Sequence, residues 1–165
     1  MALYFPPVGF HFRVDFGRIP AGGADIRFQS VSGINASVPN SQPYEEGGEN
    51  RFTHRLPVRG SYENLVLKRG MLIGSELIGW FKDAIESFKF KPQLITVTLL
   101  NSDHVPLEAW LFHNAWPTKW NIDGFDAEKG AIVIETVEFS YQYFERMEVR
   151  DKPEEFKNSQ PSRPL

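Results

Sequence analysis

The run Leu94-Ile95-Thr96-Val97-Thr98-Leu99-Leu100 is rich in β-branched and aliphatic residues, and the polar turn Asn101-Ser102-Asp103 follows it directly. A second run with strand character, Leu107-Glu108-Ala109-Trp110-Leu111-Phe112-His113, comes after this turn. β-Branched and aromatic residues favour pleated sheets, whereas Asn, Ser and Asp favour turns. The sequence therefore predicts an antiparallel hairpin over residues 94–113 and a fold built mainly from β-strands.

Further strands are indicated by alternation of apolar and polar residues, which is the two-residue period of a half-buried strand. Residues 10–16 alternate most clearly, and residues 26–31 resume the alternation after a Gly- and Pro-containing turn, so we expect these two runs to form a hairpin. Residues 35–44 form a weaker extended stretch whose prolines suit an edge strand. Leu65–Leu67 form a short strand that ends in Lys68-Arg69-Gly70, and residues 131–144 are expected to form the last strand, beside the 94–113 hairpin.

A single helix is predicted at about residues 75–89. Ser75 is a suitable N-cap because its hydroxyl can accept a hydrogen bond from a free amide of the first turn, and the acidic Glu76 suits the helix dipole. Pro92 ends the segment. We expect one apolar face, made of Leu77, Phe81, Ala84, Ile85 and Phe88.

One helix among six or more strands predicts two packed antiparallel sheets, arranged as an orthogonal sandwich or a flattened barrel, with the helix over an open end. Residues 45–61 form a long polar loop, and loops of this length in compact domains are usually functional or disordered. We expect one domain over residues 1–145. Residues 146–165 are charged, contain three prolines, and are expected to be a flexible tail.

Composition narrows the possible functions. The chain has 165 residues, a formal charge of −3 and no cysteine, so disulfides and thiolate metal sites are excluded. The charge provides no broad basic surface for sequence-specific nucleic-acid binding. No apolar run is long enough for a membrane span and no secretory signal is evident, so we expect synthesis in the cytoplasm.

Catalytic and metal-binding motifs are also missing from the sequence. The four histidines do not show zinc-motif spacing, and the adjacent Glu45 and Glu46 lie in a polar glycine-rich loop rather than in a recognisable acid–base pair. No Ser, His and Asp set stands out, so we predict no enzyme activity, no cofactor and no metal. The tryptophans at 110, 116 and 120 are interpreted as core or subunit-interface residues.

Several motifs occur in order along the chain and carry a resemblance to a known family. They are Pro7–Val14, Phe28–Ile34, the loop Glu46-Gly47-Gly48-Glu49-Asn50, Tyr62–Gly70 and Asn114–Trp120. Together they resemble the tail-tube proteins of contractile phages and extracellular contractile injection systems and, more remotely, the haemolysin-coregulated tube protein of type VI secretion.

The resemblance implies two orthogonal sheets and a helix, assembled into hexameric rings that stack into a hollow tube. Sheath contraction would drive this tube through a target envelope, with cargo protein or phage DNA in its lumen. Expected partners are copies of the chain, other tube paralogues, and sheath and baseplate proteins, in a phage virion or a released or anchored phage tail-like particle. The residues expected at contacts between subunits or rings are Glu46, Glu49, Asn50, Arg51, Arg55, Arg59, Lys68, Arg69, Trp116 and Lys119.

Two alternatives remain at this point. The C-terminal tail is compatible with a baseplate-proximal tube initiator that uses the tail as an adaptor, as well as with the repeated shaft subunit. A different class of function is a monomeric β-rich module that binds carbohydrate or peptide on an aromatic platform around Trp116–Trp120.

Overall fold

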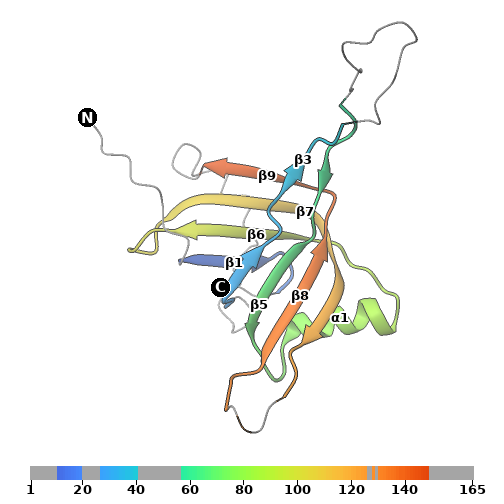
Figure 1. Ribbon diagram of the computed structural model, residues 1–165, viewed down its shortest axis with the longest axis vertical. Coiled ribbons are helices and arrows are strands. Elements are labelled where there is room, and N and C mark those ends of the chain that lie inside the picture. The colour runs from blue at the N-terminus through green and yellow to red at the C-terminus, as the bar shows by residue number, and fades with distance from the viewer. Residues whose placement is uncertain (1–10, 20–26, 41–56, 126–127, 129, 149–165) are drawn as a thin grey trace, which may run out of the picture.

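The computed structural model describes residues 11–19, 27–40, 57–125, 128 and 130–148. The described elements are nine strands and one helix (Figure 1). In chain order they are β1 (Phe12–Phe16), β2 (Ser30–Ser32), β3 (Ala36–Ser37), β4 (Ser61–Tyr62), β5 (Leu65–Gly70), α1 (Glu76–Glu86), β6 (Gln93–Leu100), β7 (Pro106–Ile122), β8 (Ile134–Ser140) and β9 (Tyr143–Glu148).

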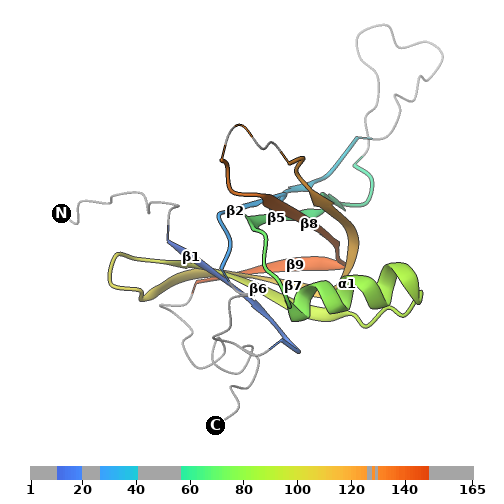
Figure 2. The same cartoon turned by 90° about the horizontal axis from the view of Figure 1, so that it is seen from below.

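Seven of the strands form two antiparallel sheets that share one long strand, and β3 and β4 pair separately with each other. Sheet A consists of β1, β6, the first half of β7, and β9, whereas sheet B consists of the second half of β7, β8, β5 and β2. Figure 1 shows the strands of sheet A running across the view, while β5 and β8 run steeply, and Figure 2 shows the two sheets as separate layers. The path of pairing ends at β1 and β2, so the fold is an open pair of sheets and not a closed barrel.

The chain passes between the two sheets twice at one corner. β7 crosses at Asn114, which has a φ of 51°, and the connection from β8 to β9 crosses at Tyr141 and Gln142. The Gln142 amide donates to the His113 carbonyl over 3.0 Å, and the Asn114 Nδ2 donates to Gln142 Oε1 over 2.7 Å. These bonds hold the two crossings together and fix how the sheets face each other.

The main core lies between the two sheets and extends to the helix. Phe139 of β8 is near its centre, with its ring centroid 5.8 Å from Phe16, 5.4 Å from Trp80 and 5.3 Å from Phe81. Burial of such aromatic side chains is a dominant stabilising contribution. Because Trp80 and Phe81 belong to α1, these contacts place the helix over one end of the sandwich, as the sequence predicted.

The helix differs in detail from its prediction. The N-cap is confirmed, because the Ile78 amide donates to Ser75 Oγ over 3.4 Å, but the helix ends at Glu86 rather than near residue 89. Its buried residues are Leu77, Trp80, Phe81 and Ala84. The prediction was wrong for Ile85 and Phe88, which are 57% and 81% exposed.

The strand pairing confirms one predicted hairpin and corrects another. β6 pairs with β7, and Asn101 Oδ1 accepts bonds from the Asp103 and Val105 amides in the turn between them. The expected hairpin of residues 10–16 with residues 26–31 is wrong in its described part, because β1 pairs with β6 and β2 pairs with β5. The last expected strand is two strands, β8 and β9, and β9 continues to Glu148, past the expected start of the tail.

Candidate assembly surfaces

An exposed two-stranded projection extends from the edge of sheet B. We call it the ribbon, and it consists of residues 35–40 and 57–64, all exposed, which include β3 and β4. Figure 1 shows it rising beyond the two sheets. The Val58 amide donates to the Pro39 carbonyl over 3.0 Å, and the Ser37 and Ser61 hydroxyls lie 2.8 Å apart.

The base of the ribbon contacts the corner where the chain changes sheets. The Tyr62 ring lies 5.9 Å from Tyr141 and 5.5 Å from Phe144, centroid to centroid. Burial, with smaller contributions from neighbouring Tyr62 and Glu63, raises the pKa of Tyr141 to about 12. These aromatic contacts fix where the ribbon leaves the body of the protein.

Gly33 allows the ribbon to start where it does. Its φ is +82°, and a Cβ at this position would lie 1.9 Å from the Asn64 carbonyl oxygen. Only glycine adopts such a backbone conformation readily and also permits such a close approach. This requirement explains the glycine in the Phe28–Ile34 motif.

The ribbon presents apolar side chains to water. Val38 is 63% exposed, Val58 is 44% exposed and Tyr62 is 42% exposed. An isolated two-stranded ribbon is marginally stable in water at best, so this segment is suited to contact with another surface.

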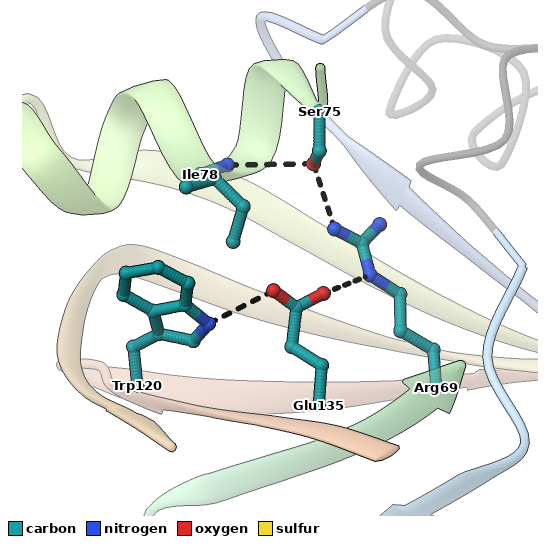
Figure 3. Close-up of polar contacts among 5 residues, drawn as sticks. All are labelled: Arg69, Ser75, Ile78, Trp120 and Glu135. Atoms are coloured by element: carbon teal, nitrogen blue, oxygen red, sulfur yellow. Dashed lines mark hydrogen bonds and ion pairs between the residues drawn. The ribbon is translucent and has the colours of Figure 1, made fainter. Parts of the chain in front are cut away.

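A buried ion pair connects sheet B to the helix (Figure 3). Arg69 Nε lies 2.7 Å from Glu135 Oε2, and both side chains are 1% exposed. Arg69 Nη2 donates to Ser75 Oγ over 2.7 Å, and Trp120 Nε1 donates to Glu135 Oε1 over 2.8 Å. The pair therefore fixes β5, β8 and β7 relative to the N-terminus of α1.

The structure separates the predicted contact residues into three groups. Glu46, Glu49, Asn50, Arg51 and Arg55 lie outside the described residues. Four others lie at the surface: Arg59 on the exposed ribbon, and Lys68, Trp116 and Lys119 on the outer side of sheet B. Arg69 is the exception. The prediction that it contacts another subunit is corrected, because its side chain is buried inside the protomer.

The alternation of buried and outward-facing residues in β5 and β8 could have indicated that Arg69 is buried. Leu65, Leu67 and Arg69 lie on one face of β5, and Glu135, Val137 and Phe139 lie on one face of β8. A charged residue at the end of each apolar series was a candidate for an internal pair. Which acidic residue faces Arg69 depends on the pairing of β5 with β8, which local alternation does not specify.

The tryptophans do not form a common exposed platform. Trp110 and Trp120 pack against the main core, whereas Trp116 lies opposite Ser140 and is half-buried. Nothing in this arrangement supports the alternative of a carbohydrate- or peptide-binding module. Among the described residues, no three His, Asp or Glu side chains are grouped to hold a metal ion. The described part of the chain also includes no helix with the length and apolar character of a membrane span.

Solved structures of injection-system proteins have the same fold. A chain of the anti-feeding prophage baseplate is 27% identical, with a TM-score of 0.78, and the match covers 90% of this chain and 99% of that one. A chain of an extracellular contractile injection system, the PVC sheath-tube complex in its extended state, is 26% identical with a TM-score of 0.73, covering 89% and 95%. An Hcp protein, at 13% identity and a TM-score of 0.56, shares the fold, with 84% and 92% covered.

The family match is made at the level of sequence as well as structure. No curated protein sequence matches this chain. The family model for the T4-like virus tail tube protein gp19 matches residues 8–145, which include every described strand except the end of β9. The order of motifs, the two-sheet fold and this match agree, and the chain belongs to the T4-like virus tail tube protein gp19 family.

Proposed function

We propose that this protein is a structural subunit of the inner tube of a contractile injection machine or phage tail. The observation that carries the proposal is the family match over residues 8–145. The similarity to chains from a baseplate and from a sheath-tube complex supports it. In this role the chain is not an enzyme. It forms a passive conduit that sheath contraction drives through a target envelope, and the energy comes from the sheath.

The assembly is a hexameric ring that stacks on further rings. A cyclic arrangement satisfies each heterologous interface, and pairing between sheet edges of neighbouring subunits uses main-chain hydrogen bonds. The strands at the edges of sheet A are β1 and β9, and β2 is an edge strand of sheet B. Ring closure through such edges removes unpaired strands that would otherwise promote aggregation.

Contacts between rings or subunits are made by the ribbon and by the sequence segment 41–56 that connects its two halves. Arg59, on the described ribbon, contributes together with Glu46, Glu49, Asn50, Arg51 and Arg55. The charged side chains of this set pair with opposite charges of a neighbouring copy, while the exposed Val38, Val58 and Tyr62 supply apolar contact. Lys68, Trp116 and Lys119 lie on a different surface, the outer side of sheet B.

The partners are other copies of the chain, tube paralogues, and sheath and baseplate proteins. The particle assembles in the bacterial cytoplasm, and the lumen carries cargo protein or phage DNA. The position in the tube is either the repeated shaft or a ring near the baseplate. A shaft subunit stacks on itself, whereas an initiator ring requires a partner before further rings add.

Sedimentation velocity of the purified chain over a concentration series tests this proposal. The expected result is a species of six times the 18.9 kDa protomer mass, with larger species as concentration rises. Deletion of residues 46–58 is expected to leave a folded protomer that no longer stacks. Stacked tubes formed by the deletion variant would overturn the role of residues 46–58 in stacking, and a monomer at every concentration would overturn the tube assignment.

A further inference from the structure

The short segment that follows α1 carries two exposed aromatic side chains, Phe88 and Phe90, which we call the aromatic pair. Phe88 is 81% exposed and Phe90 is 43% exposed, and their ring centroids lie 5.0 Å apart in an edge-to-face arrangement. Ile85, in the last turn of the helix, is also exposed. Exposed apolar groups gathered in one place mark surfaces that other molecules cover.

Phe88 has a backbone conformation that its side chain makes unfavourable. It directly follows Ser87, the C-cap of α1, and its φ is 50°. Glycine is the usual residue after a helix C-cap with this conformation, because a Cβ is crowded by the backbone there. Strain of this kind is commonly retained at functional sites. Since the Phe88 ring is mostly exposed, the strain indicates a contact outside the protomer.

Two contacts with Asp83 hold the aromatic pair in place. The Lys89 amide donates to the Asp83 carbonyl over 2.9 Å, and Lys91 Nζ lies 3.4 Å from Asp83 Oδ2. The backbone bond satisfies one of the carbonyls that the end of a helix leaves free. The segment therefore has a defined geometry before any partner binds, which lowers the entropic cost of binding.

An open cavity of about 240 Å³ lies between the two sheets, lined by residues of β1, β2, β6 and β7. Its apolar lining consists of Phe12, Val31, Ile34, Val97, Leu99 and Trp110. Val97 is buried, whereas the other five side chains are only half-buried. The space between the sheets is therefore not filled here, and an apolar group from outside would complete the packing.

The aromatic pair and the cavity lie on opposite sides of the protomer. Figure 1 and Figure 2 both show the C-terminal end of α1 on one side of the molecule and the β6–β7 turn on the other. The cavity is near this turn, because Leu99, close to the end of β6, pairs with Phe12 at the start of β1. Phe88 therefore cannot fill the cavity of its own protomer. Two such regions on one subunit allow a heterologous contact, in which every copy both donates and receives a side chain.

We propose that Phe88 of one copy inserts into this cavity of the next copy in the ring, with Phe90 packed at the cavity rim. The inference rests on the proposed tube function and names a side chain and a cavity that join neighbouring subunits. β1 and β2, which both line the cavity, are also edge strands proposed to meet a neighbour.

The size and chemistry of the cavity suit a phenyl ring. An engineered apolar cavity of about 150 Å³ binds benzene, so the larger cavity of this protein has room for the Phe88 ring. An aromatic side chain in a desolvated apolar pocket is a common form of strong interface contact.

Phe88→Gly tests the contact, because glycine removes the ring and also relieves the left-handed backbone. The variant should unfold in urea at about the same concentration as the unsubstituted chain. Ring formation, followed by sedimentation velocity, is expected to require at least roughly tenfold more protein. Phe125→Gly is the matched control, because it removes a ring that is 79% exposed between β7 and β8 and should leave ring formation unchanged. Unimpaired rings of Phe88→Gly, or equal impairment by Phe125→Gly, would overturn the inference.

Chemical crosslinking tests which surface receives the ring, because the chain contains no cysteine. Chains with Phe90→Cys are mixed with chains with Ser30→Cys, a residue at the cavity, and assembled rings are treated with a short bismaleimide. Both variants retain Phe88. The expected product is a covalent dimer joined through residues 90 and 30, while Phe125→Cys mixed with Ser30→Cys gives no such dimer.

The outcomes separate this inference from the proposed function. Rings that assemble without the dimer joined through residues 90 and 30 would overturn the inference and leave the aromatic pair for a different partner, while the tube function would stand. Failure of the unsubstituted chain to form rings would instead overturn the proposed function.

Discussion

Arg69 Nε and Glu135 Oε2 lie 2.7 Å apart in the interior of the protomer, where each side chain is 1% exposed. Arg69 also donates to the hydroxyl that caps α1, and Glu135 also accepts from Trp120 Nε1. A buried ion pair is costly to desolvate and becomes strongly destabilising when one partner is removed. This pair therefore specifies how the helix and sheet B fit together more than it adds to net stability.

Replacement of Arg69 by Ala is expected to lower the free energy of unfolding by about 3–5 kcal/mol, because it leaves Glu135 buried without its partner. Urea unfolding followed by circular dichroism measures the change. Lys119→Ala is a matched control, since it removes the exposed ion pair with Glu138 and should cost at most about 1 kcal/mol. Equal losses for the two variants would contradict the structural role given to Arg69.

Gly33→Ala is expected to destabilise the protein through both backbone strain and a clash with the Asn64 carbonyl oxygen. Gly74→Ala is the matched control, because Gly74 has a similar φ of +77° but has no atom within 4 Å of the added Cβ. We expect about 1 kcal/mol for Gly74→Ala and a clearly larger loss for Gly33→Ala, measured by denaturant unfolding. A smaller effect at Gly33 would show that the close approach to Asn64 is not required.

The raised pKa of Tyr141 predicts a loss of stability at alkaline pH. Between the ordinary tyrosine pKa near 10 and the folded-state pKa of about 12, the unfolded chain has released the proton while the folded chain retains it. Unfolding is therefore favoured as pH rises through this window. Tyr141→Phe should remove this component and give a flatter stability curve from pH 10 to pH 12 than the unsubstituted chain.

The difference between the stability curves of the unsubstituted chain and Tyr141→Phe isolates the contribution of Tyr141 ionisation, because the other ionisable groups are common to both proteins. Tyr143→Phe is the control, since Tyr143 is 37% exposed on the neighbouring strand. Parallel curves for the unsubstituted chain and Tyr141→Phe would contradict the prediction.

Val38→Asp is expected to block stacking without unfolding the protomer. Val38 is 63% exposed on the ribbon, so a carboxylate there meets water in the free protomer but would be desolvated in an interface. Sedimentation velocity measures the loss of large species, and circular dichroism checks the fold. Ser102→Asp adds the same charge in the exposed turn between β6 and β7 and tests whether charge alone is responsible.

Local features of the sequence predicted local structure well. The Ser75 cap and the β6–β7 hairpin depend on residues close together in the chain, and both are present. The pairing of β1 could not be predicted in this way. Phe12 lies opposite Leu99, and alternation within residues 10–16 carries no information about a partner so distant in sequence.

The corner at Tyr141 and Gln142 shows a second limit of prediction from local sequence patterns. Val137, Phe139 and Tyr141 are buried, and the alternation continues in the sequence to Tyr143. In the structure the strand breaks there, so that Phe144 packs against the core and Tyr143 lies outside. A strand that leaves one sheet for another can preserve its apolar alternation locally, and only the pairing of β8 and β9 with different halves of β7 reveals the change.

Negative-stain electron microscopy of the purified chain across a concentration series tests the central claim most directly. The account predicts hollow six-fold rings that stack into tubes in a shaft subunit, or rings that stack only after a partner is added in an initiator. Particles that remain single protomers at every concentration, with or without tube and baseplate partners, would contradict the assignment of this chain as a tube subunit.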